Sequence, residues 1–182
     1  MKQLLVVFSL LLVSATTYAQ KNFSTSTAVV RFIAVDDTDI DATNKKAVSR
    51  LQSNGDMSFI MLMKDFTFDM DKMQEHFNEE YVESDKFPKA EFKGAVANNA
   101  AVNYSKDGTY AVTVKGKLTM HGQTKDVEAP GKLIVQGGKV NATASFAVLL
   151  ADYGVSIPGV VADKVNKTAK IEVACNLEPL KS

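Results

Sequence analysis

The sequence has little of the chemistry that most enzymes and metalloproteins need. Its 182 residues include two histidines, one cysteine and no tryptophan. A zinc site needs three or four convergent ligands, and His76, His121 and Cys175 stand far apart in the chain. No Gly-x-Ser-x-Gly nucleophile elbow and no glycine-rich phosphate loop is present. We therefore expect no catalytic residues, no metal site and no cofactor.

An excess of charge of one sign is also missing. The 21 Lys and Arg residues balance the 21 Asp and Glu residues, so the formal net charge is zero. Without a basic surplus we expect no nucleic acid as a partner. Because a lone cysteine cannot form an internal disulfide, the domain must be held together by its core.

Long apolar runs are missing except at the start of the chain. Leu4 to Ala15 is almost wholly apolar, follows Lys2 and is followed by "TYA". This run is short for a membrane span and has the layout of a secretory signal peptide. We expect residues 1–19 to be a signal peptide, and residues 20–182 to form one periplasmic or secreted domain that does not span the membrane.

What the chain has in abundance is alternation of apolar and polar residues with period two, which predicts β-strands. Turn dipeptides separate the runs, and Asn54-Gly55 and Asp107-Gly108 suit tight hairpins in which both central residues have positive φ. The expected strands are roughly 27–36, 40–53, 56–68, 90–98, 108–120, 124–135, 139–152 and 168–178. Eight mostly antiparallel strands predict an all-β closed barrel, because closure leaves no exposed edge.

One segment has a helical period instead. In "DMDKMQEHFNEEYV", Met70, Met73, Phe77 and Tyr81 stand three or four residues apart. We expect one short helix near residues 71–81 that closes one end of the barrel or lies against its mouth.

The residues expected to face inward mix small side chains with large, soft ones. The small ones are Gly94, Gly116, Ala129, Gly131, Ala142, Ala144 and Ala169, and the large ones are Phe92, Leu118, Met120, Phe146 and Val148. An eight-stranded barrel with room along one wall can enclose one small ligand. The alternative is a flattened barrel with the helix packed into the gap.

The stretch "FIMLMKDFTFDM" has two apolar faces. Phe59, Met61 and Met63 alternate with Ile60 and Leu62, so we expect this strand to be buried on both sides. Its outer face would then meet the helix or a second subunit, and the alternative is ordinary core.

Two polar residues lie near the ends of expected strands. Counting by twos from Val140 places Asp152 on the inward face, where a charge needs a partner, water or a ligand head group. His121 stands in the corner "MHGQTK", and three roles remain open for it: scaffold, head-group contact or catalysis.

Four motifs follow one another along the chain: "HFNEEYVESDKFPKAEFKG", "YAVTVKGKLTMHGQTKDVEAP", "ASFAVLLADYGVSIP" and "AKIEVAC". Together and in this order they resemble the YceI-like family of exported bacterial proteins. The resemblance implies an eight-stranded antiparallel lipocalin-like barrel that binds an isoprenoid or other long-chain amphiphile, with no defining catalytic activity. It is also compatible with a homodimer. The family's frequent Arg before the Asp-Tyr-Gly turn is replaced here by Leu149, Leu150 and Ala151.

The resulting hypothesis is a periplasmic or secreted carrier of a hydrophobic chain. The residues predicted to contact the ligand are Phe59, Met61, Met63, Phe92, Leu118, Met120, Ala142, Ala144, Phe146, Val148, Asp152 and Tyr153. The main alternative is an interaction module in envelope stress or surface assembly, without a bound ligand. An enzyme acting on a lipid-like substrate would need a base such as His121 or Asp152 to face the interior.

Overall fold

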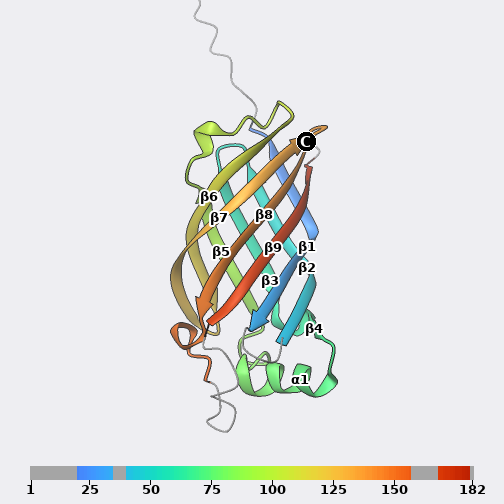
Figure 1. The fold of residues 1–182 in the computed structure, drawn as a ribbon, viewed down its shortest axis with the longest axis vertical. Helices are drawn as coiled ribbons and strands as arrows, with labels where there is room; N and C mark the ends of the chain where they lie inside the picture. Colours follow the sequence, from blue (N-terminus) through green and yellow to red (C-terminus); the bar gives the residue numbers. More distant parts are fainter. Residues whose placement is uncertain (1–19, 35–39, 157–167, 181–182) are drawn as a thin grey trace, which may run out of the picture.

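The computed structural model describes residues 20–34, 40–156 and 168–180. In these ranges nine strands form one antiparallel sheet that closes on itself (Figure 1). They are β1 (Asn22–Ala34), β2 (Ile40–Gln52), β3 (Asp56–Leu62), β4 (Phe66–Phe68), β5 (Lys89–Val96), β6 (Gly108–Met120), β7 (Gln123–Gln136), β8 (Lys139–Leu149) and β9 (Thr168–Pro179). Eight of them run in the order β1-β9-β8-β7-β6-β5-β3-β2, and pairing of β1 with β2 completes the circle. The predicted eight-stranded barrel is confirmed.

The ninth strand arises because the expected strand 56–68 is interrupted. A short 3-10 helix, η1 (Met63–Asp65), separates β3 from β4, and both strands pair with β2 at different places along it. The buried side chain of Asn44 donates a hydrogen bond of 2.9 Å to the Leu62 carbonyl at this break. A side chain therefore satisfies a backbone group that a continuous ladder would have paired.

The outer face of β3 is not covered by the described part of this chain, so the expected contact with the helix is wrong, while contact with a second subunit stays a prediction. Ile60 and Leu62 are 43% and 51% exposed. Val48 on β2, which pairs with Ile60 on β3, is 40% exposed. The helical segment lies at the end of the barrel instead of along this face (Figure 1).

That segment comprises α1 (Asp71–His76) and the π-helical turn η2 (Phe77–Tyr81), which confirms the predicted helix near 71–81. Phe77 is buried and Met73 and Tyr81 are half-buried, whereas Met70 is 62% exposed. The Phe77 ring lies 4.9 to 6.0 Å from three aromatic rings of the barrel, those of Phe32, Phe66 and Phe68. These contacts fix the helical segment against what we call the helix end of the barrel.

The opposite end is filled with side chains, and we call it the packed end. Phe23 on β1 faces Leu51 on β2, and Val140 on β8 faces Leu177 on β9. All four are at most 1% exposed, and the ring of Tyr104 lies 5.8 Å from that of Phe23. The interior is therefore closed at this end by ordinary core packing.

The tight turns differ in part from expectation. Both residues of His121-Gly122 have positive φ, at 50° and 73°, as the hairpin between β6 and β7 requires. At Asn54-Gly55 only the glycine does, because the Asn54 side chain accepts a hydrogen bond from the Asp56 amide and makes the turn in another way. Gly108 begins β6 without positive φ, since the chain reaches it from β5 through η3 (Asn99–Ala101) and a loop.

The strand expected to reach residue 152 ends earlier. β8 stops at Leu149 and the 3-10 helix η4 (Leu150–Tyr153) follows, with Gly154 in the left-handed conformation after it. The change of period from two to three alters which residues face the interior beyond this point.

Candidate functional site

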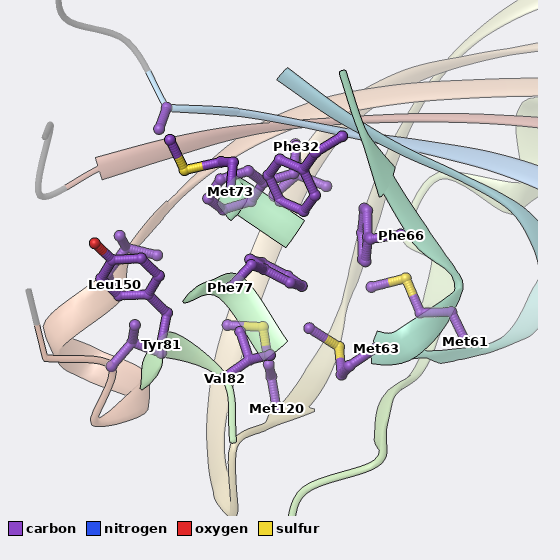
Figure 2. A pocket seen from close by; sticks show the side chains of 14 residues that line it. Phe32, Met61, Met63, Phe66, Met73, Phe77, Tyr81, Val82, Met120 and Leu150 are labelled. Carbon is purple, nitrogen blue, oxygen red and sulfur yellow. The ribbon is translucent and has the colours of Figure 1, made fainter. Parts of the chain in front are cut away.

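Two adjoining apolar cavities occupy the barrel interior. The larger, of about 110 Å³, lies in the middle of the barrel, and the smaller, of about 70 Å³, lies beneath the helical segment (Figure 2). We call them the mid-barrel cavity and the helix-end cavity. The mid-barrel cavity is lined by Val30, Met57, Phe59, Met61, Phe92, Val112, Val114, Leu118, Met120, Ala129, Leu133, Ala142, Thr143, Ala144, Phe146, Val148, Ile171, Val173 and Cys175. The helix-end cavity is lined by Phe32, Ala34, Met61, Met63, Phe66, Phe68, Met73, Phe77, Tyr81, Val82, Met120, Leu150, Val155 and Ile171.

The lining is almost entirely carbon and sulfur. Among the described residues that line the cavities none is charged, and the side chains with a polar group are Tyr81, Thr143 and Cys175. An apolar cavity of about 150 Å³ in another protein stays dry and admits benzene. By the same physics these cavities favour hydrocarbon over water.

Small residues make room in the mid-barrel cavity, but not all of those expected to do so. Gly94 pairs with Gly116, and a Cβ added at Gly116 would lie 2.4 Å from the Lys93 carbonyl and 2.7 Å from the Phe92 ring. Because Gly94 and Gly116 have no side chains, they leave room for the Phe92 ring and let the backbones of β5 and β6 approach closely. The open space lies instead beside alanines such as Ala142 and Ala144.

Ten of the twelve residues predicted to contact a ligand line the cavities. Met63 borders only the helix-end cavity, and Met61 and Met120 border both. The remaining seven border only the mid-barrel cavity: Phe59, Phe92, Leu118, Ala142, Ala144, Phe146 and Val148. Contact with a ligand stays a prediction for all ten.

Asp152 and Tyr153 do not line either cavity. Asp152 is exposed on η4, so its predicted inward orientation is wrong, and Leu150 faces the helix-end cavity in its place. Tyr153 is buried, and within the described part of the chain its hydroxyl has no hydrogen-bond partner. Burial, with a smaller effect of the Asp152 charge, raises the pKa of Tyr153 to about 12.

His121 connects three segments at the helix end. Its Nδ1 lies 2.9 Å from the Tyr153 carbonyl oxygen on η4, and its Nε2 lies 3.0 Å from Oε2 of Glu83, just after η2. The Phe87 ring packs 4.3 Å from the imidazole. Both polar partners are acceptors, so both hydrogen bonds form together when each ring nitrogen carries a proton. Because His121 is outside both linings, this geometry supports the scaffold role over head-group contact or catalysis.

Sequence reasoning missed several lining residues whose signal was present. Phe32 alternates with Val30 and Ala34 on β1, and Ile171 and Val173 belong to the alternating face of β9. The helical face was recognised but not assigned to a site, although Met73, Phe77 and Tyr81 line the helix-end cavity. Cys175, expected as a small buried residue, is in the wall of the mid-barrel cavity, where burial raises the pKa of its thiol to about 11.

Neither a metal site nor a membrane-spanning helix is found in the part of the chain that the structure describes. There, no three His, Cys, Asp or Glu side chains are grouped so as to hold a metal ion. No described helix is long and apolar enough to cross a membrane.

Comparison with known families identifies this barrel. Residues 12–177 match the YceI-like domain. The chain belongs to the YceI-like family. No curated protein sequence matches this YceI-like chain.

Solved structures share its fold at low sequence identity. A polyisoprenoid binding domain from Saccharophagus degradans, implicated in plant cell wall breakdown, has a TM-score of 0.76 and 12% identity, covering 87% of this chain and 98% of that one. BcnA from Burkholderia cenocepacia has a TM-score of 0.70 and 15% identity, covering 82% and 95%. The YCEI protein of Campylobacter jejuni has a TM-score of 0.56 and 14% identity, covering 81% and 89%.

Proposed function

We propose that this YceI-like protein is an exported carrier that holds the apolar chain of an isoprenoid or other long-chain amphiphile inside its barrel. The observation that supports this most is the lining of the two cavities, whose described residues offer hydrocarbon contact and no charged side chain. The Saccharophagus degradans domain of the same fold is a polyisoprenoid binding domain, which agrees with the proposal.

Burial of the chain supplies the free energy of binding. Each methylene removed from water contributes about 0.8 kcal/mol, so a tail of about a dozen carbons gains about 10 kcal/mol before ordering costs are subtracted. Such a tail exceeds either cavity at its present volume. Binding therefore requires the flexible methionine side chains of the lining to move aside.

The tail enters from the helix end. The packed end is closed by side chains such as Phe23 and Leu177, each 1% exposed. At the helix end Met73 and Tyr81 border the cavity and remain half-buried, so solvent reaches them. Among the described residues of this lining Tyr81 is the one that carries a polar group, and we assign its hydroxyl to the ligand's head group.

Extraction of protein purified from its native host tests the carrier function. Organic solvent should release an apolar chain in near-stoichiometric amount, identified by mass spectrometry, and the delipidated protein should bind an added polyprenol. Protein that releases no apolar chain and binds no polyprenol would contradict the proposal.

Export is the second part of the proposal. Residues 1–19, the predicted signal peptide, are outside the described residues. Mass analysis of the same host-purified protein should find Gln20 at or near its N-terminus. Mature protein that retains Met1 would contradict export by cleavage of this segment.

An interaction module without a ligand is the second candidate, and one observation favours it. Val48, Ile60 and Leu62 form an exposed apolar strip on the outside of β2 and β3. A partner protein or a second copy of the chain could cover this strip. This candidate takes first place if host-purified protein carries no ligand.

A further inference from the structure

Among the residues that the structure describes, three belong to the linings of both cavities. They are Met61 on β3, Met120 at the end of β6 and Ile171 on β9. The three strands are at different positions around the barrel, so the side chains approach the interior from different sides. Figure 2 shows Met61 and Met120 at the boundary of the helix-end cavity, on different elements. Every other lining residue borders only one cavity, so these three stand between the two spaces.

We propose that Met61, Met120 and Ile171 form a soft partition that sets the length of chain the barrel accepts. This inference rests on the proposed carrier function. A tail that enters from the helix end fills the helix-end cavity first, and it reaches the mid-barrel cavity only after the partition opens. Methionine has three rotatable bonds and a polarizable sulfur, so Met61 and Met120 can swing aside. Ile171 is β-branched and stiff, and it provides the fixed side of the passage.

The number of atoms removed with the two methionine side chains predicts how far the preferred chain length shifts. Replacement of Met by Ala removes three heavy atoms, so the double variant Met61→Ala/Met120→Ala removes about as many as the five carbons of one isoprene unit. This variant should favour chains longer by about one unit. Ile171→Phe adds bulk at the same place and should favour shorter chains.

Two other methionines give a matched control. Met57 borders only the mid-barrel cavity and Met63 borders only the helix-end cavity. Met57→Ala/Met63→Ala removes the same atoms from the same interior but leaves the partition intact. A mere increase in volume would affect both double variants equally, whereas a partition makes them differ.

The experiment loads each delipidated variant with an equimolar mixture of polyprenols from three to ten isoprene units and measures the bound chains by native mass spectrometry. Thermal melting confirms that each variant is folded, and the single variants Met61→Ala and Met120→Ala replace the double variant if it is not. The ratio of longest to shortest bound chains should rise by at least about tenfold in the partition variant, fall in Ile171→Phe and change less than about twofold in the control.

The outcomes separate the two proposals. Equal shifts in the two double variants, or an unchanged ratio in the partition variant, overturn the partition and leave the carrier function standing. No polyprenol bound to any protein, the wild type included, overturns the carrier function itself and the partition with it.

Discussion

At the scale of single residues, the thiol of Cys175 has a testable dependence on pH. Burial raises its pKa from 9.0 to about 11, and the Ser49 hydroxyl opposes this only in part. Between these pH values the unfolded chain has lost the proton that the folded chain keeps, so the free energy of unfolding falls as pH rises. We expect the thiol to contribute a loss of about 2 kcal/mol across this window.

The control variant for this prediction is Cys175→Ala, which has no thiol to titrate. Tyr104 and Tyr153, whose pKa values are raised from 10.0 to about 12 by burial, lower the stability of both proteins alike from about pH 10 upward, so the comparison with Cys175→Ala removes their effect. Urea unfolding below pH 9 and near pH 11 measures the difference. Parallel loss of stability in the two proteins would show that the thiol does not contribute.

At the scale of elements, His121 should hold the helix end together. Its two hydrogen bonds join the β6–β7 corner to Glu83 and to the backbone of Tyr153. We expect His121→Ala to lower the free energy of unfolding by about 1–3 kcal/mol, because it leaves the carbonyl of the buried Tyr153 without its partner. Hydrogen exchange should quicken in η2 and η4 while the strands stay protected.

Glu83→Ala is the matched variant, because it removes only one of the two His121 bonds, together with an exposed ion pair to Lys86. The new residue keeps a side chain at a backbone position with φ of 44°, so the left-handed strain is unchanged. Its effect should be smaller than that of His121→Ala. Equal exchange rates in wild type and His121→Ala would contradict the scaffold role.

The uncovered strip on β2 and β3 makes a prediction of its own. Ile60 is 43% exposed and pairs with Glu91 on β5. Ile60→Lys should therefore change stability by less than about 0.5 kcal/mol in dilute protein, since no buried contact is lost. A large loss of stability, or a change in molecular mass in sedimentation, would show that another molecule covers the strip.

Local periodicity predicted the elements wherever backbone pairing alone decides them. The alternation of β6, β8 and β9 reappears in which residues are buried, and the helical face of Met73, Phe77 and Tyr81 meets the barrel. The break at η1 could not be predicted, because the Asn44 side chain that satisfies it is eighteen residues from Leu62. The predicted inward orientation of Asp152 was wrong, because counting by twos fails where a 3-10 helix begins.

At the scale of the whole molecule, the hollow interior predicts that added bulk is tolerated. Ala144 on β8 faces the mid-barrel cavity. Ala144→Phe should fill that space and give a folded protein that no longer binds long polyprenols, because these need the mid-barrel cavity. A solidly packed barrel would instead lose about 1–3 kcal/mol or more through displaced neighbours.

A phenylalanine introduced on the outer face of β8 provides the control for Ala144→Phe. Ala147 is exposed on β8, so Ala147→Phe should leave both stability and binding nearly unchanged. Melting curves of delipidated protein and mass spectrometry of bound polyprenol give the two measurements. Retained binding of long polyprenols in Ala144→Phe would place the ligand elsewhere.

The hollow itself was only partly predictable. The sequence indicated small inward residues, but it did not distinguish Gly116, whose space a ring and a backbone fill, from Ala144, which borders open space. That distinction depends on how Phe92 turns its ring in three dimensions. The two-cavity arrangement likewise depends on where Met61, Met120 and Ile171 meet across the barrel.

The most direct test of the central claim is where a bound chain lies, and the methionine methyl groups can report it by NMR. Of the methionines that the structure describes, five line the cavities: Met57, Met61, Met63, Met73 and Met120. Met70 is 62% exposed and lines neither cavity, so it is an internal control. Titration of protein labelled with carbon-13 in these methyls with a polyprenol should shift the five signals and give intermolecular contacts to them, while Met70 stays unchanged. Shifts at Met70 alone, or none at all with polyprenol bound, would contradict binding inside the barrel.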